Sequence, residues 1–216
     1  MNLNITLAII IITCLVSVPA FSSQKMIDDL IFYPPAIYRR NQWYRFFTCG
    51  FIHADWMHLA FNMYAFYAFG NYIEDAFTQI FGSSGKLLYI ILYITSLFFC
   101  LLPTYLKHRD NAYYRSLGAS GAVSAIVFAF IFLFPNEGIG LIFIPGLHVP
   151  GFIFGILYLV ISSILAKRGG SHINHSAHLW GAVYGIVFTV VAAFALTHYN
   201  LPQLFLQQVQ SYFGSL

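Results

Sequence analysis

The sequence predicts an all-α membrane protein, a polytopic six-transmembrane-helix bundle.

 The prediction rests on two observations. Only 8% of the 216 residues are charged and 59% are hydrophobic, whereas a soluble domain usually has about 25% charged residues. Several uncharged runs also approach the roughly 20 residues that a helix needs to cross a bilayer. We therefore expect a single membrane domain over residues 1–216.

The six expected spans follow from the hydrophobic runs and from the residues that interrupt them. The first has no Lys or Arg before its apolar stretch, so we interpret it as a retained span and not as a signal peptide. The fourth ends at Pro135, and Pro145 and Pro150 place the start of the fifth near Gly151, because proline breaks a helix. The spans are expected at about residues 3–21, 56–73, 87–106, 116–134, 151–166 and 176–197.

Two segments outside these spans are predicted to lie at the membrane surface. Residues 22–55 mix aromatic side chains with Arg39, Arg40 and Arg45, a combination that suits the headgroup region of a bilayer. We expect this loop to lie partly in the membrane interface. Residues 201–216 carry a weak helical stripe of apolar residues, which predicts a short surface helix.

The charges constrain the partners and the orientation. The net charge of +3 is small and scattered, which argues against a nucleic-acid partner. Nine of the ten Lys and Arg residues fall in the first, third and fifth loops, so the positive-inside rule places these loops in the cytoplasm. The three cysteines, Cys14, Cys49 and Cys100, form no metal or disulfide pattern, and we interpret them as small buried side chains.

Three polar clusters stand out, because polar groups inside a bilayer are costly. His58 and Asn62 lie near the start of the second span, Ser120 near the start of the fourth, and His175 and His178 at the start of the sixth. Spans 2, 4 and 6 run in the same direction, so their starts share one membrane face. The clusters are therefore expected at one depth, on the order of 5–10 Å below that face.

Small residues predict that the fourth and sixth spans touch. His178, Gly181 and Gly185 share one helix face, and the fourth span carries Gly118 and Gly121. Such residues let two helix backbones approach closely. Ser120 and His178 would then lie within hydrogen-bond reach, where a histidine can take the proton of a serine hydroxyl.

Hydrolysis of a peptide bond also needs donors for the developing oxyanion. His58, the side-chain amide of Asn62 and the backbone N–H of Ser120 could supply them. No acidic residue lies close to His178 in the sequence, so we expect a Ser–His dyad without an aspartate. Each of these residues alone is more typical of packing or of an interface; their joint occurrence at one depth favours a site.

With these residues in view, the chain resembles the rhomboid family of intramembrane serine proteases, in its six-span bacterial form. The resemblance is carried by residues 44–48 (YRFFT) with His53, by residues 58–63 (HLAFNM), by residues 116–122 (SLGASGA), and by residues 177–181 (AHLWG) with Gly185. It covers most of the chain, and its three motifs occur in the family's order.

The resemblance implies a role for each matching residue. Ser120 would be the nucleophile and His178 the base, while His58, Asn62 and the Ser120 amide would form the oxyanion hole. Gly118, Gly121, Gly181, Gly185 and Arg45 would be structural. It further implies that the protein cleaves transmembrane segments of other membrane proteins, without metal or cofactor, and that it lies in the bacterial inner membrane.

Two residues depart from the family pattern, and one expectation conflicts with the charge count. Tyr44 stands where the family usually has Trp, and Ser124 stands where an aromatic side chain often packs against the catalytic histidine. The resemblance places the first loop outside the cytoplasm, which is opposite to the positive-inside prediction.

Two other functions remain open at this point. A non-catalytic relative could act as a binding protein or chaperone, although such relatives typically lack the serine or the histidine. A metal site or transporter could use His53, His58, His175 and His178, since neutral imidazole suits zinc. The chain has no His-Glu-x-x-His sequence, however, and sensitivity to a chelator would separate this alternative from a serine mechanism.

Overall fold

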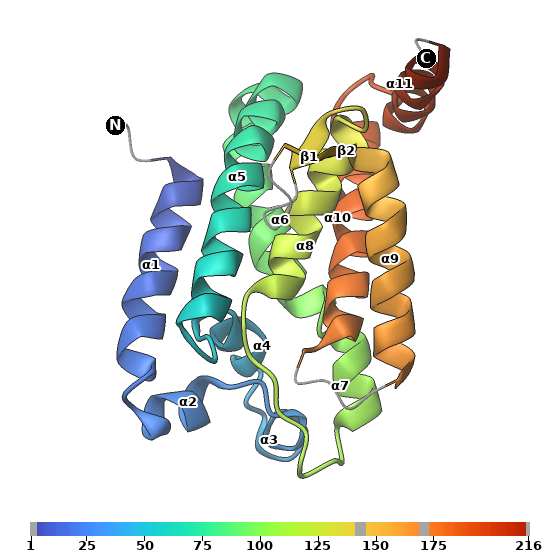
Figure 1. The fold of residues 1–216 in the computed structure, drawn as a ribbon. Helices are drawn as coiled ribbons and strands as arrows, with labels where there is room; N and C mark the ends of the chain where they lie inside the picture. Colours follow the sequence, from blue (N-terminus) through green and yellow to red (C-terminus); the bar gives the residue numbers. More distant parts are fainter. Residues whose placement is uncertain (1–3, 141–145, 169–172, 215–216) are drawn as a thin grey trace.

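The protein is a bundle of helices, seen in Figure 1 as a computed structural model that describes residues 4–140, 146–168 and 173–214. Between two of the helices lies a short antiparallel pair of strands, in which Ile139 faces Val149. The helices are α1 (Ile5–Ala20), α2 (Gln24–Leu30), α3 (Pro34–Arg40), α4 (Arg45–Thr48), α5 (Trp56–Phe81), α6 (Gly85–Phe99), α7 (Leu102–His108), α8 (Ser120–Leu133), α9 (Gly151–Arg168), α10 (His175–Leu196) and α11 (Leu201–Gly214), with short 3₁₀ turns η1 (Cys49–Phe51) and η2 (Gly82–Ser84) and strands β1 (Gly138–Gly140) and β2 (His148–Pro150).

The predicted all-α membrane bundle is confirmed. The helical stretches Trp56–His108, Gly151–Arg168 and His175–Leu196 are long and apolar enough to cross a bilayer. Helices α1 and α8 are apolar but shorter, with 16 and 14 residues. The expected surface helix after the sixth span is present as α11.

Several predicted span limits differ from the helices. Helix α5 continues to Phe81 instead of ending at residue 73, because Ala76 and Phe77 extend its buried face. The third span is divided into α6 and α7, and α7 has a proline in its first turn. The predicted start of the first span, Leu3, and the predicted breaker Pro145 lie outside the described residues.

The fourth span begins at Ser120 and not at residue 116. Ser116 instead pairs with Phe32 in an isolated antiparallel bridge. Gly118 has a φ of 108°, which a helix cannot contain and which side chains with a Cβ rarely adopt. Because the segment from Ser116 to Gly118 is not helical, α8 begins at Ser120.

Helix α8 forms the centre of the bundle. It contacts α5, α6, α9 and α10, and it lies among them in Figure 1. Every residue of α8 except Ser120 and Phe132 is buried. A helix that is apolar on all sides can be buried on all sides, so the sequence of α8 explains its central place.

Helix α1 is held against α5 by a buried carboxylate. Glu74, which is 3% exposed, accepts hydrogen bonds from the backbone N–H groups of Ile5 and Thr6 at 3.0 and 2.9 Å. The hydroxyl of Thr6 donates a third at 2.9 Å. The unpaired N–H groups at the start of α1 are thereby satisfied, and the negative charge lies at the positive end of the helix.

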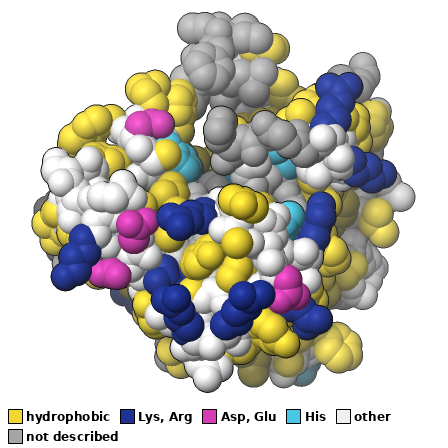
Figure 2. Space-filling view, turned by 90° about the horizontal axis from the view of Figure 1, so that it is seen from below, with side chains coloured by type: hydrophobic (Ala, Val, Ile, Leu, Met, Phe, Trp, Pro, Cys, Tyr) yellow, Lys and Arg dark blue, Asp and Glu magenta, His cyan; other side chains and the backbone are white. Residues whose placement is uncertain are grey.

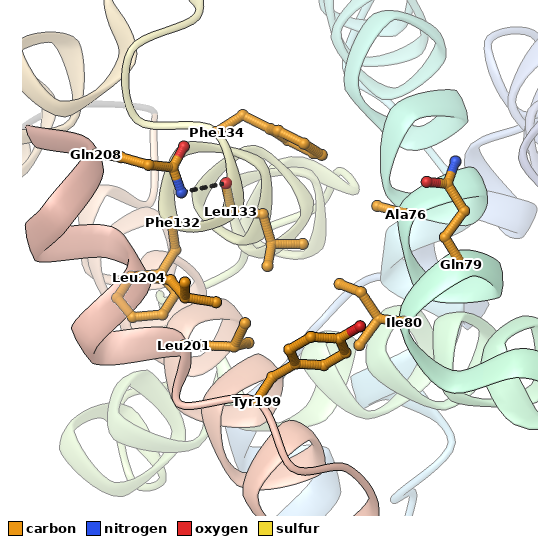
Figure 3. Close-up of a pocket in the computed structure, with 10 residues that line it drawn as sticks. All are labelled: Ala76, Gln79, Ile80, Phe132, Leu133, Phe134, Tyr199, Leu201, Leu204 and Gln208. Atoms are coloured by element: carbon orange, nitrogen blue, oxygen red, sulfur yellow. Dashed lines mark hydrogen bonds between the residues drawn. The ribbon is translucent and has the colours of Figure 1, made fainter. Parts of the chain in front are cut away.

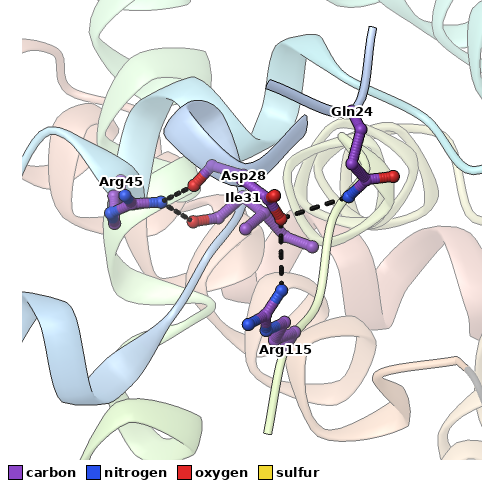
Figure 4. Close-up of polar contacts among 5 residues, drawn as sticks. All are labelled: Gln24, Asp28, Ile31, Arg45 and Arg115. Atoms are coloured by element: carbon purple, nitrogen blue, oxygen red, sulfur yellow. Dashed lines mark hydrogen bonds and ion pairs between the residues drawn. The ribbon is translucent and has the colours of Figure 1, made fainter. Parts of the chain in front are cut away.

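The first loop folds into α2, α3 and α4 below the bundle, and Arg45 ties it together (Figure 4). Arg45 is 6% exposed, and its guanidinium group makes several hydrogen bonds. It donates to the backbone carbonyls of Asp28 and Ile31, both at 2.8 Å. It also donates to the side chain of Gln42 at 2.6 Å. Through these bonds Arg45 joins the start of α4 to α2 and to the residues that follow α2.

Helix α11 packs at the opposite end of the bundle, where a small cavity of about 200 Å³ separates it from α5 and α8 (Figure 3). The amide of Gln208 donates to the carbonyl of Leu133 at 3.3 Å, and Asn136 donates to the carbonyl of Gln208 at 2.7 Å. Apolar side chains such as Ile80, Leu201 and Leu204 make up most of the wall. This cavity is therefore part of the α11 packing.

The lower face of the molecule, viewed in Figure 2, carries a concentration of Lys and Arg side chains. Arg39 pairs with Asp110 at 3.7 Å, and Arg115 pairs with Asp28 at 3.2 Å. The odd loops that hold most of the positive charge thus lie at the end where α5, α8 and α10 begin. Which side of the membrane this face occupies stays a prediction.

Candidate active site

The site is built around Ser120 and His178, which come from different helices. Ser120 is the first residue of α8, and His178 lies in the first turn of α10. The Ser120 Oγ and the His178 Nε2 are 2.6 Å apart. An unprotonated Nε2 at this distance accepts the hydrogen of the serine hydroxyl, the arrangement that a general base requires.

Glycines allow this approach. A Cβ at Gly181 would lie 2.0 Å from the carbonyl oxygen of Gly121, and one at Gly185 would lie 2.1 Å from the carbonyl oxygen of Ala125. On α8, a Cβ at Gly121 would lie 2.6 Å from the Sγ of Cys100. The predicted close contact between the fourth and sixth spans is confirmed.

The start of α10 is fixed by Asn174, a residue that the sequence analysis did not single out. Its Oδ1 accepts a hydrogen bond from the N–H of Ala177 at 3.0 Å, as a helix N-cap does. The same oxygen accepts a bond from the hydroxyl of Thr104 in α7 at 3.3 Å. Asn174 therefore sets the position of the turn that carries His178.

Gly118 brings the chain past His58 on its way into α8. A Cβ at Gly118 would lie 2.6 Å from the Cε1 and 2.8 Å from the Nε2 of His58. The Gly118 N–H donates to the carbonyl of Cys49 at 2.9 Å. Both the positive φ and the contact with His58 require glycine here.

His53, to which the sequence analysis assigned no part in the proposed Ser–His site, supports the same turn. Its Nδ1 lies 2.9 Å from the hydroxyl oxygen of Ser17, and that hydroxyl donates to the carbonyl of Phe51 at 2.8 Å. Ser17 must therefore accept from Nδ1–H. The Nε2 is then free to accept the N–H of Ala119 at 3.4 Å, so the contacts favour one neutral tautomer.

Burial explains why this histidine stays neutral. His53 lies in the loop before α5 and is fully buried. Burial, with a smaller contribution from nearby His58, lowers the pKa of His53 from 6.5 to about 3. A protonated ring would have no acceptor role toward Ala119, the residue next to Ser120.

Acid is expected to destabilise the protein through His53. The unfolded side chain takes up a proton near pH 6.5 and the folded one near pH 3, so the stabilisation is intact above pH 6.5 and is lost as the pH falls toward 3. Between pH 6.5 and 5 the loss is on the order of 2 kcal/mol. Thermal unfolding in detergent at both pH values measures it.

His53→Gln should reduce this acid-dependent loss, because glutamine does not titrate. An unchanged pH dependence in His53→Gln would contradict the assignment.

His58 and Asn62 lie one turn apart on α5. The N–H of Ala54 donates to the Nδ1 of His58 at 3.4 Å, which leaves the hydrogen of a neutral ring on Nε2. Asn62 is 7% exposed, and its amide donates one hydrogen bond to the carbonyl of His58 at 2.9 Å. This bond uses one of the two amide hydrogens.

Ser120 lies where two cavities meet. One, of about 610 Å³, is lined by His58, Gly118, Ser120 and His178. The other, of about 890 Å³, is lined by Asn62 and Ser120 together with side chains of α5, α8 and α9. A carbonyl group held at Ser120 would therefore be near His58 in one cavity and near Asn62 in the other.

The two departures from the family pattern have structural counterparts. At the first, Tyr44 is exposed, while the neighbouring Trp43 stacks on Phe46 with ring centroids 5.8 Å apart. At the second, Ser124 hydrogen-bonds to Tyr158 of α9 at 2.6 Å, and the Tyr158 ring lies 6.4 Å from that of His178. Sequence reasoning missed Tyr158 because nothing in the fifth span indicates which face points inward.

Two further histidines lie near the pair. The His175 ring lies 5.8 Å from that of His178, but His175 lines a different cavity beside α7. His148 belongs to β2 and lines the larger cavity at Ser120. Across residues 4–140, 146–168 and 173–214, no group of three or more His, Cys, Asp or Glu side chains is placed to hold a metal ion.

The Rhomboid domain family matches residues 40–194. RHOMBOID-like protein 12, mitochondrial, of Arabidopsis thaliana is 32% identical over 156 residues, which is 65% of this chain and 44% of the relative. Presenilin-associated rhomboid-like protein, mitochondrial, of Mus musculus is 30% identical over 144 residues, or 63% of this chain and 34% of the relative.

A bacterial relative matches over a larger share. YdcA of Bacillus subtilis, named as a candidate rhomboid protease, is 28% identical over 175 residues, which is 80% of this chain and 78% of the relative. The chain spans less than half the length of the two mitochondrial relatives above. Since the Rhomboid domain match extends over most of the chain and includes Ser120 and His178, the protein belongs to the rhomboid family.

Proposed function

We propose that the protein is an intramembrane serine endopeptidase in which Ser120 is the nucleophile and His178 is the general base. The observation that carries the proposal is the 2.6 Å distance between the Ser120 Oγ and the His178 Nε2. The pair lies at the junction of two cavities within an apolar bundle. Membership of a family that includes a named candidate protease supports it.

The chemistry follows from the positions of the groups. His178 takes the hydroxyl proton as Ser120 Oγ attacks the carbonyl carbon of the peptide bond. His58, Asn62 and the backbone N–H of Ser120 stabilise the negative oxygen of the tetrahedral intermediate. His178 then gives its proton to the leaving amine, and water, activated by the same ring, hydrolyses the ester on Ser120.

The proposed substrates are transmembrane segments of other membrane proteins. The larger cavity at Ser120 is bounded by α5, α8 and α9, and Ser120 lies in the first turn of its helix, close to one end of the apolar bundle. A peptide bond that reaches Ser120 would come from a segment near the membrane surface.

The protein is an integral membrane protein. The relatives bear on which cellular membrane contains it. The relatives include mitochondrial proteins of a plant and a mouse as well as a bacterial protein. The bacterial inner membrane expected from the sequence is therefore not supported, and we restrict the proposal to a cellular membrane that contains single-span substrates.

The proposal is tested by co-expression with a library of single-span membrane proteins, comparing the intact chain with Ser120→Ala. Cleavage products that depend on Ser120 support a protease. Binding of library members without cleavage by the intact chain would favour the non-catalytic alternative. A parallel sample with a chelator separates the serine mechanism from the metal alternative, which predicts loss of activity on metal removal.

Removal of the oxyanion donors should slow the enzyme without abolishing it. Asn62→Ala and His58→Ala are expected to lower kcat by about 10²–10³, or less where the remaining donors compensate. KM should change little, since the bonds strengthen only as charge develops on the oxygen. Kinetics in detergent or liposomes measure both constants.

The same variants should still react with a fluorophosphonate probe at Ser120, at a lower rate. Tyr67→Ala, at an exposed residue of α5 that is not among the lining residues of either cavity, controls for a general disturbance of the helix. If kcat were unchanged in both donor variants, α5 would contribute packing only.

A further inference from the structure

We propose that Tyr158 of α9, acting together with Ser124 of α8, is a positioning residue that holds Ser120 and His178 in alignment. This inference rests on the proposed protease function. Tyr158 lies in the fifth span, outside the motifs that carry the family resemblance.

A chain of hydrogen bonds runs from α9 to the backbone of Ser120. The Ser124 hydroxyl is 2.8 Å from the carbonyl oxygen of Ser120 and 2.6 Å from the Tyr158 hydroxyl. A carbonyl oxygen can only accept, so Ser124 donates to Ser120 and must accept from the Tyr158 O–H. The donor direction of both hydrogen bonds is therefore fixed: Tyr158 donates to Ser124, and Ser124 donates to Ser120.

The Tyr158 ring lies on the His178 side of the same site. Its centroid is 6.4 Å from that of the His178 ring, with the two planes inclined by 30°, and it is 5.3 Å from that of Phe128 in α8. Tyr158 thus lies against the nucleophile's helix through its hydroxyl and beside the base through its ring. A single side chain of α9 constrains both members of the pair.

The remainder of α9 explains why this constraint is needed. Ile156, Leu157, Val160 and Ile161 are all exposed in the bundle and form an outward face. Tyr158 turns the other way and lines the cavity that also contains Ser120 and Asn62. Without its hydrogen bond, this part of α9 would contact the site through apolar packing alone.

Four variants separate the hydroxyl from the ring: Tyr158→Phe, Ser124→Ala, the double variant and Tyr158→Leu. Loss of one hydrogen bond should lower kcat about three- to tenfold with KM unchanged. Because Tyr158 and Ser124 form one chain, the double variant should match the single variants within about twofold. Tyr158→Leu, which also removes the ring, should lower kcat about 10- to 100-fold.

The matched control is Tyr184→Phe. The Tyr184 hydroxyl donates to Thr95 across α10 and α6 at 2.7 Å, so this variant loses a comparable bond between helices away from the pair. It should lower Tm while leaving kcat within about twofold of the wild type. Tm and kcat of all variants are measured in the same detergent.

The outcomes distinguish this inference from the proposed function. If the wild type cleaves no substrate, the proposed function fails. If the wild type is active and Tyr158→Phe and Ser124→Ala keep full kcat, the positioning role is wrong. It is also wrong if these variants lower kcat only in proportion to Tm, as a purely structural residue would. Where Tyr158→Leu fails to fold, Tyr158→Phe alone decides.

Discussion

Ser120→Ala and His178→Ala are each expected to abolish cleavage of a transmembrane substrate while the bundle stays folded. The first removes the attacking oxygen, and the second removes the group that takes its proton. We expect kcat to fall by about 10⁴ or more in each. The double variant should be no worse than either single variant, because the two side chains act as a unit.

The measurement is cleavage of a reconstituted single-span substrate, with Tm as the check on folding. Replacing either partner of the hydrogen bond should change stability by about 1 kcal/mol. His175→Ala and Ser176→Ala are matched controls, since both lie in the same first turn of α10 but line the cavity beside α7. They should keep most of the activity. Full activity in His178→Ala would exclude it as the base.

The sequence was sufficient to predict how the helices bring the polar clusters together. Spans that run in the same direction start on the same face, which placed His58, Ser120 and His178 at one depth. The glycine spacing of the sixth span predicted the contact with the fourth, and a Cβ at Gly181 would indeed lie within 2.0 Å of a backbone oxygen. These inferences needed only helix geometry.

The sequence could not predict contacts that depend on how a helix is rotated. The fifth span is apolar around its circumference, so its pattern did not indicate that Tyr158 faces inward to Ser124. Nor did it indicate that His53 accepts the N–H of Ala119, because that contact joins a loop to the turn before α8. The start of α8 depended on the backbone of Gly118, whose φ of 108° has no signature in hydrophobic periodicity.

The charge pattern illustrates a different limit. Nine of the ten Lys and Arg residues lie in odd loops, and the structure gathers these loops at the end where α5, α8 and α10 begin. Several of these side chains already have partners: Arg45 binds backbone carbonyls and Arg115 pairs with Asp28. Such residues contribute to the folding of the loops, so their count is a weaker guide to orientation than the rule assumes.

Gly181→Val should damage stability and activity together. The Cβ would lie 2.0 Å from the Gly121 carbonyl oxygen, on the residue next to Ser120. Neither atom belongs to a flexible side chain, so α8 and α10 must move apart. We expect a loss of about 3–5 kcal/mol in stability, and a kcat at least about 10² lower, because a shift of about 1 Å separates the hydroxyl from its base.

The position of the clash can be tested with two further glycines. Gly185→Ala introduces a similar contact, 2.1 Å from the Ala125 carbonyl oxygen, one turn farther from His178, so it should lower Tm with a smaller effect on kcat. Gly155→Ala in α9 is the control, since its Cβ would lie 3.4 Å from Ile131, an ordinary contact. That variant should keep its activity and gain slightly in stability, as alanine favours a helix over glycine. Tm and kcat for the three variants, measured in the same detergent, decide the matter: if Gly181→Val behaved like Gly155→Ala, close contact between α8 and α10 would not be what aligns Ser120 with His178.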